Sequence, residues 1–169
     1  DKRRDEVSKS NRILWDKFKA TDPGYTKEVN NGRHTFTNVD AHWQLEKATE
    51  EFGPYGDRWG LRNMQFSTIE TSDGVVSATL IAEFFYPLML QQGEASLSQT
   101  ASFPIAVDLK FRHGDDCYKK LITTARSKAL SYIGMSADVY LGKFEDDAYV
   151  KDARVKYEDQ EAFVKKARA

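Results

Sequence analysis

Basic side chains that could bind phosphate stand in three short stretches of this chain, close to aromatic and hydroxyl residues. They are Lys27 and Arg33, then Arg58 and Arg62, then Lys119, Lys120, Arg126 and Lys128. No acidic residue falls between Lys119 and Ala137. Cations and hydroxyls bind phosphate oxygens, and aromatic rings stack on bases. The combination is typical of a surface that binds single-stranded nucleic acid.

The charge of the chain changes sign along the sequence, although its total is only −1. Residues 1–39 carry a net +3 and residues 109–134 a net +4, whereas residues 40–108 carry −7. Such a distribution says more about a nucleic-acid partner than the total does. The alternative is that both basic blocks are solvated helix surfaces with no partner.

No group of residues has the spacing of a catalytic or nucleotide-hydrolysing site. There is no GxxxxGK[ST] loop, and His113 with Cys117 would give a metal only two ligands. We therefore expect a chain that is not an enzyme and has no cofactor and no metal site. One alternative stays open, a metal-dependent nuclease that uses Glu145, Asp146 and Asp147, although helix capping explains these carboxylates better.

The elements that must position the cations follow an α+β pattern. We expect helices over 1–20, 40–52, 115–133 and 147–169, a small hairpin over 27–37, and antiparallel strands over 59–70, 76–86 and 97–107. The expected turns are Asn30-Asn31-Gly32, Ser72-Asp73-Gly74 and Gln92-Gly93-Glu94. The result is a β-β-β-α core with a small N-terminal hairpin and flanking helices.

Single residues set the ends of these elements. Asp40 is the expected N-cap of the second helix, and Gly53 and Gly134 are expected to end helices. Asp115 and Asp116 suit the start of the third helix. Pro104 predicts an edge strand or an early strand end.

A helical wheel divides the four cations of the third helix between two borders of its apolar stripe. Lys119 and Arg126 lie on one side, and Lys120 and Lys128 lie toward the other, so only one pair can line a given groove. We expect Trp59 and Tyr132 to pack in the core, and Tyr55 is a further aromatic candidate.

The length of 169 residues fits one domain over 1–150 with a charged tail over 151–169. A single cysteine, Cys117, excludes an internal disulfide and fits a reducing compartment. No apolar stretch is long enough to span a membrane, and no signal peptide is visible.

Two stretches resemble the single-strand annealing superfamily, which includes the eukaryotic Rad-fifty-two recombination mediator and the phage ERF and Sak annealers. They are ATEEFGPYGDRWG (48–60), which precedes the strands, and LITTARSKALSYIG (121–134). The segments YTKEVNNGRHTFTNVD (25–40) and ADVYLGKFEDDAYV (137–150) add to the likeness, the latter to the phage branch. The resemblance covers about residues 12–150, and the order and spacing of the motifs carry it.

The resemblance implies ATP-independent binding of single-stranded DNA and annealing of complementary strands during phage-type recombination and DNA repair. It implies a homo-oligomer, a ring or a filament, in the cytoplasm of a bacterial host, with a phage or host single-strand-binding protein or nuclease as a further partner. By position, Lys128 matches a DNA-contacting basic residue of the family. Ser127 and Ser131 stand where the family often has further basic residues. Lys27 and Arg33 lie in the hairpin region that contacts DNA.

A second function fits the same fold. The acidic block at 40–108 and the charged tail favour an interaction module that recruits a replication or recombination partner without binding DNA itself.

Overall fold

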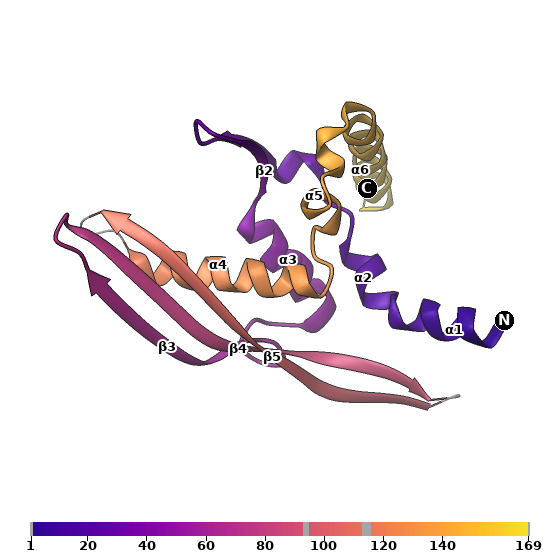
Figure 1. The fold of residues 1–169 in the computed structure, drawn as a ribbon. Helices are drawn as coiled ribbons and strands as arrows, with labels where there is room; N and C mark the ends of the chain where they lie inside the picture. Colours follow the sequence, from indigo (N-terminus) through magenta and orange to yellow (C-terminus); the bar gives the residue numbers. More distant parts are fainter. Residues whose placement is uncertain (1, 93–94, 113–115, 169) are drawn as a thin grey trace. The chain divides into compact units, whose positions relative to one another are not determined.

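The fold is described from a computed structural model, which covers residues 2–92, 95–112 and 116–168 (Figure 1). The chain forms two compact units. One is built from residues 1–44 together with 133–169, and the other from the continuous stretch 45–132. We call them the terminal unit and the central unit. The boundary predicted after residue 150 stays a prediction.

The central unit is an antiparallel meander with one helix on it. Its strands, in the order β3-β4-β5, are β3 (Gly60–Glu70), β4 (Val75–Gln92) and β5 (Ala95–Arg112). Helix α4 (Cys117–Tyr132) lies along one face of this sheet (Figure 1). The coarse α+β prediction, with a three-stranded sheet followed by a helix, is therefore confirmed.

The core of the central unit follows from the period-two pattern of the strands. Ala78, Leu80, Ala82 and Phe84 point from β4 toward α4 and are buried, and their partners on β5 include Ile105 and Val107. Leu121, Ala125 and Ala129 of α4 cover them. Trp59 is fully buried, as predicted, and its Nε1 donates to the Gly53 carbonyl at 2.6 Å.

Strands β4 and β5 extend well past β3 as a two-stranded ribbon (Figure 1). The prediction of an edge strand at Pro104 is confirmed, because among the described residues β5 pairs only with β4. The prediction of an early strand end is wrong. An edge strand tolerates proline because the missing N–H can face away from its neighbour. The expected turn at Gly93-Glu94 lies outside the described residues.

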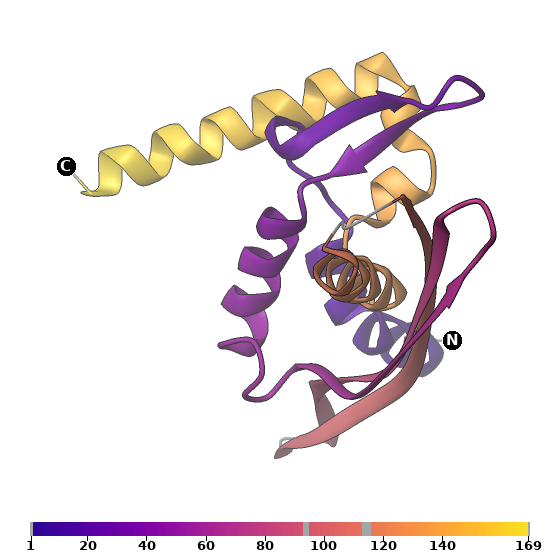
Figure 2. The same ribbon diagram turned by 90° about the vertical axis from the view of Figure 1, so that its left-hand side faces the viewer.

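The terminal unit contains short elements from both ends of the chain. The N-terminal part holds α1 (Lys2–Asn11), α2 (Ile13–Phe18), a 3-10 turn η1 (Pro23–Tyr25), and strands β1 (Thr26–Asn30) and β2 (Thr35–Val39). The C-terminal part holds α5 (Ala137–Tyr140), η2 (Lys143–Glu145) and the long single helix α6 (Asp147–Arg168), drawn in yellow in Figure 2. Helix α3 (Ala41–Phe52) runs across the division between the units.

Two local predictions in this part, the hairpin and the helix cap at Asp40, are confirmed. The hairpin pairs Asn30 with Thr35 around the Asn-Gly turn, and Gly32 adopts a φ of +83°. Asp40 caps α3, because its carboxylate accepts the N–H groups of His42 and Trp43. The helix expected over 1–20 forms as two pieces. Val7 and Ile13 of these pieces are exposed, while Phe18 is buried.

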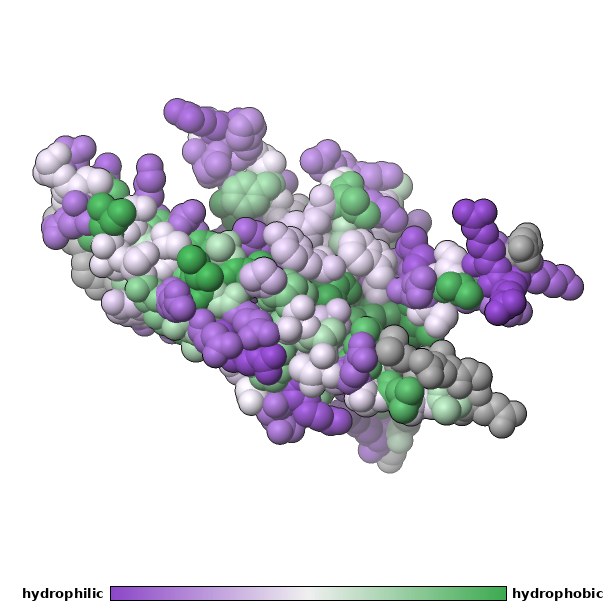
Figure 3. Space-filling model, turned by 60° about the horizontal axis from the view of Figure 1, so that its bottom comes forward, coloured by the Kyte–Doolittle hydropathy of each residue, from purple (hydrophilic) through white to green (hydrophobic). Residues whose placement is uncertain are grey.

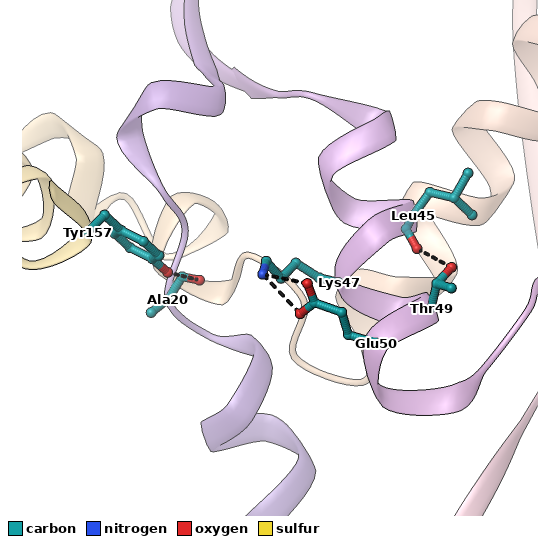
Figure 4. A network of polar contacts seen from close by, with 6 residues as sticks. All are labelled: Ala20, Leu45, Lys47, Thr49, Glu50 and Tyr157. Carbon is teal, nitrogen blue, oxygen red and sulfur yellow. Dashed lines mark hydrogen bonds and ion pairs between the residues drawn. The ribbon is translucent and has the colours of Figure 1, made fainter. Parts of the chain in front are cut away.

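A buried carboxylate joins the two ends of the chain within the terminal unit. Asp138 is 3% exposed and accepts hydrogen bonds from Thr21 N at 2.8 Å and Thr21 Oγ1 at 2.6 Å. The hydroxyl of Tyr149 donates to the same carboxylate at 2.9 Å. A second tyrosine of α6, Tyr157, donates to the Ala20 carbonyl at 3.2 Å (Figure 4). Buried charge is tolerated where it is hydrogen-bonded in this way.

Gly134 follows α4 with a φ of +105°, which confirms it as a helix stop. A Cβ at this position would lie 2.8 Å from the Cα of Trp15 in α2, so only glycine fits against α2.

Within α3, side-chain contacts such as the Lys47–Glu50 ion pair join residues of a single helical turn (Figure 4). No helix among the described residues has the length and apolar character that crossing a membrane requires.

Candidate nucleic-acid interface

Helix α4 begins at a capping carboxylate and then carries only basic, hydroxyl and apolar side chains. Asp116 Oδ1 accepts the N–H of Lys119 at 3.3 Å, which confirms its predicted role at the helix start. Asp115 lies outside the described residues. Because the apolar side of α4 is buried on the sheet, its basic and hydroxyl side chains face away from the core.

Two of the four helix cations lie over β5. Lys128 Nζ donates to the carbonyl of Ala106 at 2.9 Å, and Lys120 Nζ stands 5.5 Å from the centroid of the Phe111 ring. Arg126 lies on another side of the helix, with its Cζ 5.6 Å from the centroid of the Tyr55 ring. The predicted separation of Lys120 and Lys128 from Arg126 is confirmed. The prediction that Lys119 lines a different groove from Lys120 is wrong, because both side chains line one depression.

A shallow depression of about 340 Å³ follows the exposed side of α4. It is lined by Asp116, Lys119, Lys120, Thr123 and Thr124. Lysine and threonine side chains of this kind bind phosphate oxygens, and Asp116 restricts the anion-binding part to the far end of the depression. We call Lys119, Lys120, Thr123, Thr124 and Lys128 the α4 basic surface.

Two serines of α4, Ser127 and Ser131, add hydroxyl groups to the helix but no charge. The hydroxyl of Ser131 donates to the Lys128 carbonyl at 2.6 Å, so the hydroxyl proton is already hydrogen-bonded within the helix. Ser127 is half-buried. The positive charge of this helix therefore comes from its lysines and Arg126.

The other two candidate cations of the central unit, Arg58 and Arg62, lie in different places. Arg62 lies on the sheet face opposite α4, the face that Figure 3 brings forward with its polar and apolar side chains interspersed. Its guanidinium donates twice to Glu83, at 3.0 and 3.1 Å, and these bonds are the main reason that the pKa of Glu83 falls to about 2. The structure therefore separates Arg62 from the α4 cations, whereas Arg58 stays exposed in the loop after α3.

The hairpin of the terminal unit presents its own cations. Lys27 and Arg33 are exposed, Arg33 at the turn and Lys27 on β1. The register pairs Val29 with Phe36 and Lys27 with Asn38, so these side chains share one face. Phe36 is 48% exposed. Sequence reasoning missed this exposed ring, although pairing the strands about the Asn-Gly turn places it on the face of Lys27.

Tyr132 is a correction to the expected core. Its side chain is 57% exposed, and it only leans on Phe103, with ring centroids 5.6 Å apart. It is the last residue of α4. Tyr55, in contrast, is partly exposed at 39% and held by its neighbours.

One of the acidic residues considered for a nuclease caps a helix. Asp146 Oδ1 accepts the N–H of Ala148 at 2.9 Å, which confirms the capping interpretation for this residue. Over the described ranges, no three His, Cys, Asp or Glu side chains gather where they could hold a metal ion. His113, considered with Cys117, lies outside those ranges.

Comparison with known proteins adds no family to this geometry. No protein-family model matches the chain, and no curated protein is similar enough to it to count as a match.

Proposed function

We propose that this chain binds single-stranded DNA and anneals complementary strands without ATP, as a recombination protein in the cytoplasm of a bacterial host. The observation that carries the proposal is the α4 basic surface. This surface carries three lysines, Lys119, Lys120 and Lys128, and the helix from Cys117 to Tyr132 contains no carboxylate. A nucleic-acid backbone is the ligand whose repeated phosphates match such a row.

The resemblance of residues 48–60 and 121–134 to the annealing superfamily supports the same proposal. Annealing requires that the backbone be held while the bases remain free to pair. It makes and breaks no covalent bond, so it requires neither a catalytic residue nor a cofactor.

A homo-oligomer, in a ring or a filament, would lay one strand across many copies of the α4 basic surface. Weak interactions in each copy then add up along the strand. This arrangement offsets the near-neutral charge of a single chain.

The test is strand annealing by a Lys120→Ala/Lys128→Ala double variant. We expect its affinity for a single-stranded oligonucleotide to fall roughly tenfold or more, because two lysines no longer neutralise phosphates. The slope of log affinity against log salt should become shallower by about 0.7 for each phosphate that the variant leaves unneutralised. Annealing of two dye-labelled complementary strands should slow in parallel.

Lys110→Ala is the matched control. Lys110 lies on β5 beside the same helix but on the opposite sheet face, paired with Ser77. It removes one positive charge without touching the α4 basic surface and should leave binding unchanged. If the double variant binds and anneals like wild type at every salt concentration, the proposal is wrong.

The interaction module remains a second candidate because of α6. All residues of this helix from 158 to 168 are exposed, including Phe163 at 74% and Val164 at 43%. An exposed apolar pair on a charged helix is typical of a segment that binds another protein. Removal of residues 158–168 would abolish partner recruitment but leave DNA binding intact if both functions exist.

A further inference from the structure

Arg126 differs from the other cations of α4 because its guanidinium is half-buried and lacks a partner for one donor. Its Nε is shielded from solvent and makes no hydrogen bond. In the part of the chain that the structure describes, no carboxylate forms an ion pair with it. Burial lowers the pKa of this guanidinium below its ordinary value. A buried donor without a partner destabilises a fold unless something else fills that place.

An aromatic ring faces this guanidinium. Arg126 Cζ lies 5.6 Å from the centroid of Tyr55, within the range of a cation–π contact. The Tyr55 side chain is 39% exposed. Solvent therefore reaches the ring beside the guanidinium, so that a ligand could contact both groups at once.

The loop that carries Tyr55 is held in place by the core. The Tyr55 ring meets the buried Trp59 edge-on, with centroids 5.1 Å apart and an interplanar angle of 86°. Gly56 N donates to the Trp59 carbonyl at 2.7 Å. A Cβ at Gly60 would come within 3.4 Å of the Tyr55 ring, so the backbone itself packs against it. The ring is thus fixed before any ligand arrives.

The loop that carries Tyr55 also carries a cation, Arg58. The Nη2 of Arg58 lies 3.4 Å from the position that a Cβ on Gly53 would take, so its guanidinium folds over the end of α3. Asp57 precedes it and is exposed. The loop therefore offers an ordered ring beside Arg126 and carries an arginine of its own at the end of α3.

We propose that Arg126 and Tyr55 form a nucleotide subsite, in which the guanidinium binds a phosphate and the ring stacks on the adjoining base. The inference rests on the proposed function insofar as the nucleotide belongs to a DNA strand. Arginine binds phosphate through paired, planar N–H donors, and an aromatic ring accepts any base on its face. The subsite is separate from the lysines that lie over β5.

The test compares a thymine oligonucleotide with an abasic oligonucleotide of equal length. Tyr55→Leu should lower affinity for the thymine strand roughly tenfold and leave the abasic strand unchanged, because only stacking is removed. Tyr55→Phe keeps the ring and should bind within about twofold of wild type. Arg126→Met should weaken the binding of both strands. Arg126→Lys should restore part of the affinity, since lysine keeps the charge but lacks the paired planar donors of the guanidinium.

Tyr132→Leu is the matched control, because Tyr132 is an exposed tyrosine of the same unit and no cation of the described residues lies over its ring. Circular dichroism checks that each variant folds. If Tyr55→Leu and Arg126→Met bind the thymine strand like wild type while Lys120→Ala/Lys128→Ala fails to bind it, the subsite is overturned and the proposed function stands.

Titration with thymidine monophosphate separates the two sources of the nucleotide. If wild type binds neither oligonucleotide, the proposed function fails. Binding of the monophosphate that is abolished in Arg126→Met would then retain the subsite as a site for a free nucleotide. Absence of that binding would overturn the subsite too.

Discussion

At the scale of single residues, the carboxylate of Asp138 and the two tyrosines of α6 hold the terminal unit together. Burial is the main cause that raises the pKa of Tyr149 to about 12, and its hydrogen bond to Asp138 adds to the effect. Burial likewise raises the pKa of Tyr157 to about 12, with Asp22 and Asp138 nearby. The folded state therefore favours both phenols in their neutral form.

This preference predicts a loss of stability at alkaline pH. Because the folded pKa values exceed the ordinary value of 10.0, the stabilisation is complete below about pH 10 and is lost as the pH rises through about 12. Urea unfolding of wild type at pH values across this window should show a falling free energy. A Tyr149→Phe/Tyr157→Phe variant should show a smaller fall, and an equal fall in both proteins would contradict the assignment.

Residue roles could be predicted from sequence where the partner is local. Asp40, Asp116 and Asp146 cap the helices that begin beside them, and a cap needs only its own neighbours in the chain. The Arg62–Glu83 pair and the contact between Arg126 and Tyr55 join residues far apart in sequence. Their geometry depends on strand register and helix placement, which side-chain spacing alone does not determine.

At the scale of elements, glycines end helices and permit turns, but they differ in what surrounds them. Gly32 and Gly134 both have positive φ, +83° and +105°. Nothing lies within 4 Å of a Cβ built on Gly32, whereas one on Gly134 would meet Trp15 at 2.8 Å. Gly32 is needed only for its backbone conformation, whereas Gly134 also leaves room for Trp15 of α2.

Substitution by alanine separates these two effects. Gly32→Ala should cost about 1 kcal/mol, the usual penalty for a left-handed residue with a Cβ. Gly134→Ala should cost about 3 kcal/mol or more, because steric overlap with Trp15 is added to the backbone penalty. Thermal or urea unfolding measures both, and equal costs would show that the contact with Trp15 yields without strain.

The order of elements was predictable, but their extent was not. Alternating apolar residues and Gly-containing turns predicted the hairpin and the three strands. Strands β4 and β5 each run for 18 residues, which is longer than the strands predicted from alternating apolar residues over 76–86 and 97–107. The part of the ribbon beyond the helix has no face to bury, so it carries no such pattern. The split of the N-terminal helix at Arg12 and the short helix α5 also depend on tertiary packing.

At the scale of the whole molecule, the positive charge is local and the chain is nearly neutral, with a net charge of −1. A single copy then offers DNA only a short row of cations. Affinity for a long strand depends on how many copies bind side by side.

Mass photometry tests this dependence directly. We expect rings or filaments whose mass increases in discrete steps of one chain, and a long oligonucleotide should raise the fraction of chains in them. A short oligonucleotide that spans a single copy is the control and should leave the distribution unchanged. A monomer at all protein concentrations, with or without DNA, would rule out the multivalent arrangement.

The bond between Thr21 and Asp138 joins residues separated by 117 positions, and this separation constrains the order in which a newly made chain folds. All residues of the central unit have been synthesised once position 132 emerges from the ribosome. The end of α2 and the residues that follow it must wait longer, since the groups that bond Phe18, Lys19 and Thr21 come after residue 133. During translation, the residues made just before the central unit therefore belong to a unit that is completed after it.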